Sequence, residues 1–142
     1  MKKKIKKTKK PLLHPVITYR GWPGHFCCSQ RCVFHLNTLI EYKRIKIVVS
    51  TVGLMQDPMN KDANKVVFAE IGMDRYFETM AFHAKKNGTF WDANVQRQIY
   101  FDLPWSWGLK DEAKANAGHI KIVEEMAFRL LTGETFKIIK EI

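Results

Sequence analysis

The chain of 142 residues is 46% hydrophobic, which suits one compact core and is too short for two ordinary domains. Its formal net charge of +10 favours an anionic partner, but seven of its 24 basic residues lie within the first ten positions. The other 17 stand against 14 acidic residues, so composition alone argues against a broad nucleic-acid-binding face on the body of the protein.

No stretch approaches the length of a membrane span, and the apolar run after the first lysines is too short and too interrupted by prolines for a secretory signal. Three cysteines crowded into one segment argue against a disulfide framework and favour a reducing compartment. We therefore expect a cytoplasmic protein with no membrane partner.

The lysine-rich residues 1–12 are expected to form a disordered tail ahead of a single α+β domain over residues 13–142. A block of like charges repels itself and offers almost nothing to bury. The tail is either a solvated leader or a contact for phosphates, and such contact would be blind to sequence and sensitive to salt. The lysines concerned are Lys2, Lys3, Lys4, Lys6, Lys7, Lys9 and Lys10.

Residues 24–35, GHFCCSQRCVFH, hold every cysteine of the chain between two histidines. The candidates for a zinc site are Cys28, Cys32, His25 and His35. Their spacing contains no CxxC pair and no second ligand pair follows, which disfavours the tetrahedral set that zinc needs. A nucleophilic cysteine beside a histidine has no more support, because no oxyanion loop is recognisable. The segment is interpreted as a bend and a strand with small buried thiols, and no metal or cofactor is expected.

Several runs rich in β-branched and aromatic residues, bounded by Gly, Pro, Asn or Asp, predict strands. They cover residues 16–19, 32–42, 45–52, 65–71, 75–84 and 89–101. Residues 54–64 have turn chemistry and no period, so they are predicted to form a surface loop.

Beyond Pro104 the pattern changes to a helical period. Acids occupy positions 111 and 112, Gly133 supplies a stop, and apolar residues recur at Ala113, Ala117, Ile120, Val123, Ala127 and Leu130. Gly118 weakens this helix or lets a neighbour approach it closely. Strands followed by one helix predict an α+β fold, an antiparallel sheet of about five or six strands with the long C-terminal amphipathic helix packed on it.

The dipeptide Asn87-Gly88 predicts the loop of a β-hairpin, since both residues tolerate the positive φ of a type I′ turn. This loop places Glu78 opposite Arg97 on an otherwise apolar face, and His83 opposite Asp92 on the other face. The ion pair either fixes the register at the margin of the sheet or presents the edge of Arg97 to a phosphate. A carboxylate beside an imidazole is half of a catalytic triad, although a solvated polar face is the simpler interpretation.

The segment RGWPGHFCCSQRCVFHLNTLIEY, followed by KIVVSTVG and RYFETMAF, resembles a small protein family of bacteriophages and prophages over most of residues 19–101. More loosely, strands followed by a terminal helix resemble the phage sponges that counter Thoeris and related defences by sequestering cyclic nucleotide signals. The resemblance implies an anti-defence protein in the cytoplasm of an infected or lysogenic bacterial host. No binding residue is carried over from those sponges.

A protein that sequesters a nucleotide-like anion needs aromatic faces for the base and Arg or Lys forks for phosphate, in a pocket shared between subunits. We therefore expect a non-enzymatic, homo-oligomeric binding protein with Arg97 as its central anion contact, unprotected sheet edges favouring self-association. The other candidate ligand-binding residues are Glu78, Arg75, Trp91, Phe90, Trp105 and Trp107.

Two other classes of function stay open. An accessory or inhibitor protein could contact nucleic acid or a nucleoprotein defence complex through the basic tail, and its affinity should then collapse when residues 1–10 are removed. A small hydrolase or nuclease could use His83, Asp92 or the cysteine cluster, and single substitutions there should then abolish turnover.

Overall fold

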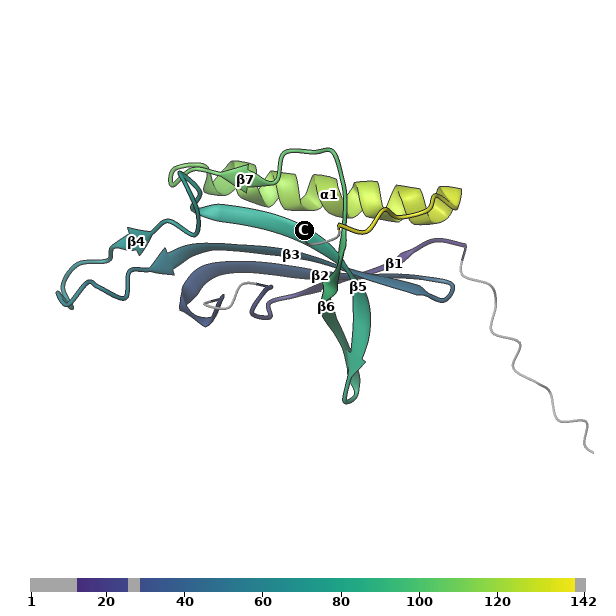
Figure 1. The fold of residues 1–142 in the computed structure, drawn as a ribbon, viewed down its shortest axis with the longest axis horizontal. Coiled ribbons are helices and arrows are strands. Elements are labelled where there is room, and N and C mark those ends of the chain that lie inside the picture. The colour runs from purple at the N-terminus through teal and green to yellow at the C-terminus, as the bar shows by residue number, and fades with distance from the viewer. Residues whose placement is uncertain (1–12, 26–28, 140–142) are drawn as a thin grey trace, which may run out of the picture.

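The computed structural model describes residues 13–25 and 29–139. One helix lies along an antiparallel sheet, which confirms the predicted α+β fold (Figure 1). The helix is not long and apolar enough to cross a membrane, nor is any other helix of the described residues. In chain order the elements are β1 (Val16–Arg20), a 3-10 helix (Ser29–Arg31), β2 (Cys32–Tyr42), β3 (Ile45–Gln56), β4 (Phe68–Ala69), β5 (Phe77–Asn87), β6 (Phe90–Ile99), β7 (Ser106–Trp107) and α1 (Glu112–Thr132).

The five longer strands form the sheet in the order β1-β2-β3-β5-β6, and each strand is antiparallel to its neighbours. β6 pairs with β5 only over residues 81–87. The first part of β5, at Phe77 and Glu78, pairs with β7 instead. Thr79 and Met80 therefore lie in the short part of β5 between the residues that pair with β7 and those that pair with β6.

The strand boundaries differ from the predicted ones where pairing depends on distant residues. β3 continues to Gln56, into the predicted loop, because Met55 and Gln56 pair with β4. β4 keeps only two of the residues 65–71 that the sequence assigns to a strand. β7 has no strand signal of its own, and it forms because the start of β5 offers it a partner.

α1 covers one face of the sheet with its apolar side. It ends as predicted at Gly133, whose φ of 73° is left-handed, and the N–H groups of Gly133 and Glu134 donate to the carbonyls of Leu130 and Arg129. The core cluster combines residues of α1 with residues of β2, β3, β5 and β6 and with Phe136, which follows the helix. Its members are Ile40, Ile47, Val49, Ala81, Ile99, Ile122, Val123, Met126, Leu130 and Phe136.

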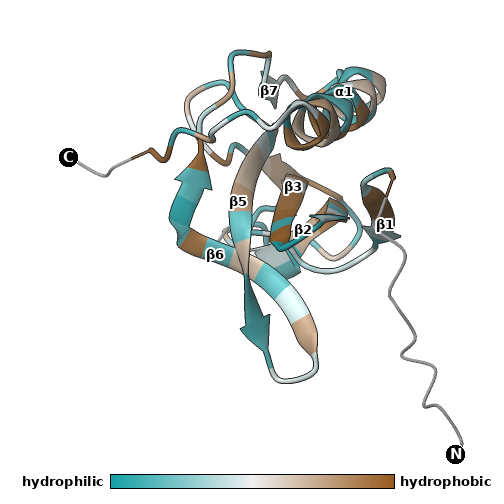
Figure 2. Cartoon of the chain, turned by 90° about the vertical axis from the view of Figure 1, so that its right-hand side faces the viewer, coloured by the Kyte–Doolittle hydropathy of each residue, from teal (hydrophilic) through white to brown (hydrophobic). Residues whose placement is uncertain are grey.

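The opposite face of the sheet is also buried, which explains the nearly continuous apolar run of β3. Successive side chains of a strand point to opposite faces, so Ile47 points toward α1 and Val48 points away from it, yet both are fully buried. Residues 21–25, which we call the segment after β1, lie over this second face, and a Cβ on Gly24 would overlap the side chain of Val52. The β5–β6 hairpin also extends to the side away from α1 (Figure 2).

The loop of the β5–β6 hairpin lies one residue later than predicted. Asn87 pairs with Phe90, so the two loop residues are Gly88 and Thr89. Within this loop Gly88 alone has a positive φ, of 62°, which is the pattern of a type II′ turn with glycine at its first central position. The expected I′ turn is wrong because Asn87 stays in the strand.

A β-bulge in β6 then changes which side chains share a face. From Ala93 to Gln98, β6 advances five positions while its partner β5 advances two. Asn94 supports the bulge, since its Oδ1 accepts the N–H of Gln96 at 3.2 Å. The extra residues are odd in number, so side chains beyond the bulge point to the opposite face from the predicted one. The cross-strand pairs that the sequence predicts for this hairpin do not form.

Candidate functional site

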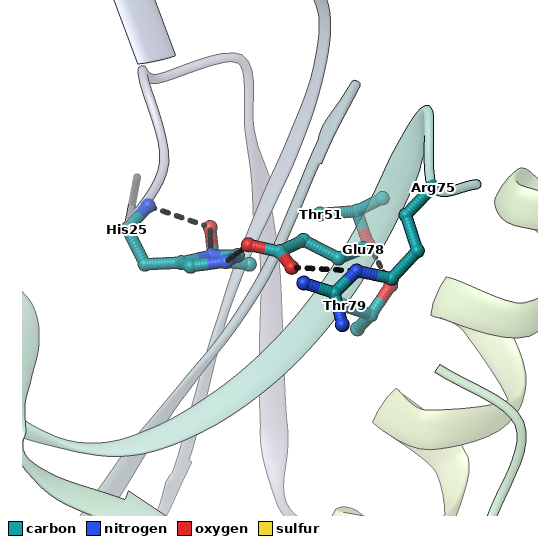
Figure 3. A network of polar contacts seen from close by, with 6 residues as sticks. His25, Thr51, Arg75, Glu78 and Thr79 are labelled. Carbon is teal, nitrogen blue, oxygen red and sulfur yellow. Dashed lines mark hydrogen bonds and ion pairs between the residues drawn. The ribbon is translucent and has the colours of Figure 1, made fainter. Parts of the chain in front are cut away.

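Glu78 is buried on the face of the sheet that points away from α1, and its carboxylate lies between two basic side chains (Figure 3). Oε1 is 3.1 Å from Nε2 of His25, and Oε2 is 3.9 Å from Nε of Arg75. The Glu78 and His25 side chains are only 6% and 4% exposed, whereas that of Arg75 is 35% exposed. The predicted partner Arg97 is wrong, because Glu78 lies beside Ser106 of β7 rather than beside β6.

His25 connects Glu78 to Ser50 on β3. Its Nδ1 lies 2.9 Å from Ser50 Oγ, which also accepts the backbone N–H of His25 at 3.2 Å. Because a carboxylate only accepts, Nε2 donates to Glu78, while the Ser50 hydroxyl can donate to Nδ1 or accept from it. These residue types match a Ser-His-acid triad, but Ser50 is fully buried and its hydroxyl already bonds the backbone. The network fastens the segment after β1 to the sheet.

The side chain of Arg75 makes no hydrogen bond within the described residues. Its guanidinium carbon lies 5.0 Å from the centre of the Trp105 ring, and it forms an ion pair with Glu78. Its Nε is buried and has no hydrogen-bond partner in the described part of the chain. A Cβ on Gly72 would overlap the guanidinium, so this glycine makes room for it. A planar fork held by a carboxylate and a ring is oriented to bind phosphate or carboxylate oxygens.

A pocket of about 210 Å³ opens beside Trp105, where β6 and β7 separate along β5. Besides Arg75, a second cation lies near this pocket: Lys137 Nζ is 5.6 Å from the centre of the ring of Tyr100, a residue of the pocket wall. The volume is below the roughly 300–1,000 Å³ of sites for drug-sized ligands, so the pocket suits one ring system rather than a whole nucleotide. Its lining is mostly apolar and aromatic: Thr79, Met80, Gln98, Ile99, Tyr100, Phe101, Trp105 and Ile139.

The predicted ligand-binding residues separate into groups. Arg75, Glu78 and Trp105 come together at this site. Trp107 is used for packing, since its ring occupies the space in which a Cβ of Gly118 would lie. Phe90 and Trp91 lie at the beginning of β6, where they pair with the last two residues of β5, at the opposite end of that strand from Glu78.

Arg97 and His83 lie apart from the site. Arg97 is exposed in the bulged part of β6. Burial lowers the pKa of His83, and the nearby Arg97 lowers it further. The His83 ring packs edge-on against Phe136, with ring centres 5.9 Å apart. Asp92 pairs with Lys85, so the predicted pairing of Asp92 with His83 is wrong.

The described zinc candidates do not converge on one point. Both ring nitrogens of His25 are engaged by Ser50 and Glu78. Cys32 and His35 lie on β2, while Cys28 lies outside the described residues. Within residues 13–25 and 29–139 no three His, Cys, Asp or Glu side chains are grouped so that they could hold a metal ion. The lysines at positions 2–10 also lie outside the described residues.

Sequence reasoning missed a second buried polar network, between α1 and the sheet. His119 places Nε2 at 2.7 Å from Thr38 Oγ1 and Nδ1 at 2.7 Å from Thr51 Oγ1, and Thr51 in turn is 2.6 Å from Thr79 Oγ1. Burial lowers the pKa of His119 to about 4. The predicted apolar side of the helix is wrong in its first half, because Ala113, Ala117 and Ile120 are exposed. The buried side begins instead with Ala115, His119 and Ile122, which recur at helical spacing.

Comparisons with protein-family models, with curated proteins and with solved structures find no match to this chain. The resemblance to a phage family therefore stays a prediction. The geometry itself defines an α+β protein in which a partly exposed guanidinium, oriented by a buried carboxylate, lies beside a small aromatic pocket.

Proposed function

We propose that the protein is a non-enzymatic binding protein for a small nucleotide-like anion, with Arg75 as the anion contact and the pocket beside Trp105 as the receptor for a base. One observation carries the proposal. The guanidinium of Arg75 is held by Glu78 and Trp105, yet its side chain donates no hydrogen bond to the described residues. A fork that is already oriented loses little entropy when phosphate oxygens bind.

The pocket supports the same class of ligand. Tyr100, Phe101 and Trp105 offer aromatic surface on which a base can stack, and the cations of Arg75 and Lys137 lie on two of these rings. Because the pocket has room for about one ring system, the phosphates would remain outside it, on the side of the cations. The carboxylate of Glu78 faces His25 and Arg75, and it acts as a positioning residue for Arg75.

On the family resemblance, this binding serves a phage anti-defence protein that sequesters a signal nucleotide in the cytoplasm of its host. Such a protein holds its ligand stoichiometrically and releases it intact on denaturation. The homo-oligomer expected from the sequence would have an edge available, because β1 ends the sheet and exposes Val16, Ile17 and Tyr19. Native mass spectrometry of protein purified from cells measures both the oligomer mass and any bound small molecule.

The first testable prediction concerns Arg75. Arg75→Ala should raise the Kd of the nucleotide about 10- to 100-fold, since hydrogen bonds to charged groups contribute roughly 1.5–3 kcal/mol. Arg75→Lys keeps the charge without the planar fork and should lie between this variant and the wild type. Isothermal titration calorimetry with AMP, ADP-ribose and a cyclic dinucleotide measures the effect, after circular dichroism has shown that each variant is folded.

Arg97→Ala is the matched control, because it removes the same side chain from an exposed position of β6 outside the site. It should bind like the wild type. Equal Kd values for the two alanine variants would remove Arg75 from the site, and no binding of any of the three probes to the wild type would contradict the proposed ligand class.

The alternative is nucleic-acid contact through the basic tail, and deletion separates the two ideas. Removing residues 1–10 should leave nucleotide binding at Arg75 unchanged. Contact through the tail predicts instead that the full chain binds anions in a strongly salt-dependent way and that the deletion abolishes this binding.

A further inference from the structure

A second group of aromatic and basic side chains lies around the beginning of β6, at the opposite end of β5 from Arg75. Arg20 stacks on Trp22, with its guanidinium carbon 3.7 Å from the ring centre, and Trp22 meets Phe90 edge-on at 5.1 Å. Lys46 Nζ lies 4.5 Å from the centre of the Trp91 ring. We call these five residues, Arg20, Trp22, Lys46, Phe90 and Trp91, the aromatic–basic surface.

Arg20 connects the two halves of this surface. Its Nη1 donates to the carbonyl oxygen of Trp91 at 2.6 Å, and its Nε donates to Oδ1 of Asn37 at 2.9 Å. Its Nη2 is buried and has no hydrogen-bond partner within the described part of the chain. A buried donor without a partner costs free energy, and a shift of this side chain toward a ligand oxygen would remove that cost. Burial lowers the pKa of Arg20, while the nearby Asp92 and Glu41 raise it.

The positive charge of the body is concentrated around the same surface. Residues 16–24, 41–48 and 84–92 contain six basic and two acidic residues, while the rest of residues 11–142 contains eleven basic and twelve acidic ones. The fold brings these ranges together, since Val16 pairs with Glu41 and Lys46 lies over the Trp91 ring.

We propose that the aromatic–basic surface binds single-stranded nucleic acid, with bases stacking on Phe90 and the tryptophan rings and phosphates on Arg20, Lys46 and the surrounding lysines. Phe90 is 42% exposed, so part of its ring is open to a base. Stacking on aromatic rings accepts any base, because every base has a π-face, and the basic residues follow the backbone. This surface is separate from the pocket beside Trp105, so the inference does not depend on the nucleotide-binding proposal.

The test measures binding of a fluorescein-labelled 12-nucleotide oligothymidine to the full chain by fluorescence anisotropy. Phe90→Ala should weaken binding about tenfold, within the range that alanine substitution of a stacking ring produces. Phe128→Ala is the matched control, since Phe128 is 59% exposed on α1 and far from this surface in the chain, and it should bind like the wild type. Lys46→Ala should reduce the slope of log K against log salt by roughly one phosphate contact.

Deletion of residues 2–10 separates the surface from the tail. We expect the deletion variant to bind the oligonucleotide more weakly than the full chain, and Phe90→Ala to weaken this remaining binding about tenfold. It is overturned if Phe90→Ala binds as well as Phe128→Ala, if the tail deletion removes all binding, or if a 12-base-pair duplex binds as tightly as the single strand. Trp22→Ala gives a second reading of the same contact, and circular dichroism verifies that each variant is folded.

Discussion

His119 links α1 to the sheet through a proton-dependent contact. A neutral imidazole has one donor and one acceptor, and the hydroxyls of Thr38 and Thr51 can each serve either role. A second proton would place a positive charge on a side chain that is 1% exposed and has no carboxylate partner among the described residues. This residue should therefore make the stability of the fold depend on pH.

The second prediction is that the free energy of unfolding falls as the pH is lowered from about 6.5 to about 4. The unfolded chain binds a proton on His119 near its ordinary pKa of 6.5, whereas the folded chain does so only near 4. Protons thus favour the unfolded state over this interval, by on the order of 3 kcal/mol at its lower end. Urea unfolding at pH 7, 5.5 and 4 measures the loss.

Two variants make this prediction specific. His119→Gln should be less stable at pH 7 and should lose this part of the pH dependence. His14→Gln, at an exposed position ahead of β1, should keep the wild-type pH dependence. If the free energy of unfolding of His119→Gln depends on pH as that of the wild type does, the buried imidazole is not the cause of the pH dependence.

At the scale of elements, β7 and α1 meet where a ring lies against a glycine. The Trp107 side chain packs on α1 at Gly118, and no Cβ fits between them. Of the two consequences predicted for Gly118, a weaker helix or a close neighbour, the structure shows the close neighbour. It also places the helix relative to the start of β5, because β7 pairs with Phe77 and Glu78.

The third prediction is that Gly118→Ala lowers the free energy of unfolding by about 1–3 kcal/mol, the usual cost of overpacking. Helix propensity alone would favour alanine over glycine by about 1 kcal/mol, so the sign of the effect distinguishes packing from propensity. Chemical denaturation measures it. Ala117→Gly, at the adjacent exposed position, is the control and should cost about 1 kcal/mol from propensity alone. A stabilised Gly118→Ala would contradict the packing described here.

At the scale of the whole molecule, the sheet is covered on both faces by different parts of the chain. α1 covers one face through aliphatic packing. The segment after β1 covers the other face through the contacts of His25 with Ser50 and Glu78, together with the close approach of Gly24. The proposed nucleotide site and the aromatic–basic surface both lie next to the segment after β1. A change that detaches this segment from the sheet should therefore affect both.

The fourth prediction is that His25→Ala lowers the free energy of unfolding by about 1–3 kcal/mol, because it leaves buried polar groups of Ser50 and Glu78 without their partner. A double-mutant cycle with Ser50→Ala should show a coupling of at least about 0.5 kcal/mol, as expected of side chains in one hydrogen-bond network. Urea unfolding of the four proteins supplies the cycle. Strictly additive effects would show that the two side chains do not act together.

The candidate site was predictable in its residue types but not in its partners. The sequence predicts Arg75, Glu78 and Trp105 among the candidate ligand-binding residues, and the structure brings these three side chains together. The pairing of Glu78 with Arg97 failed because it assumed an uninterrupted ladder from the loop. A bulge supported by the Asn94 side chain interrupts that ladder, and a change of odd length reverses the face of every later residue.

The sequence by itself determined the α+β class, the ends of β2 and the helix with its glycine stop, because these depend on hydrophobic period and on capping within a few residues. Only the tertiary structure decided that β7 exists, that both faces of the sheet are buried and that Glu78 meets His25 and Arg75. The reason is that these features depend on contacts between residues far apart in the chain, His25 and Glu78 being 53 positions apart. No local sequence pattern predicts a contact between residues that far apart in the chain.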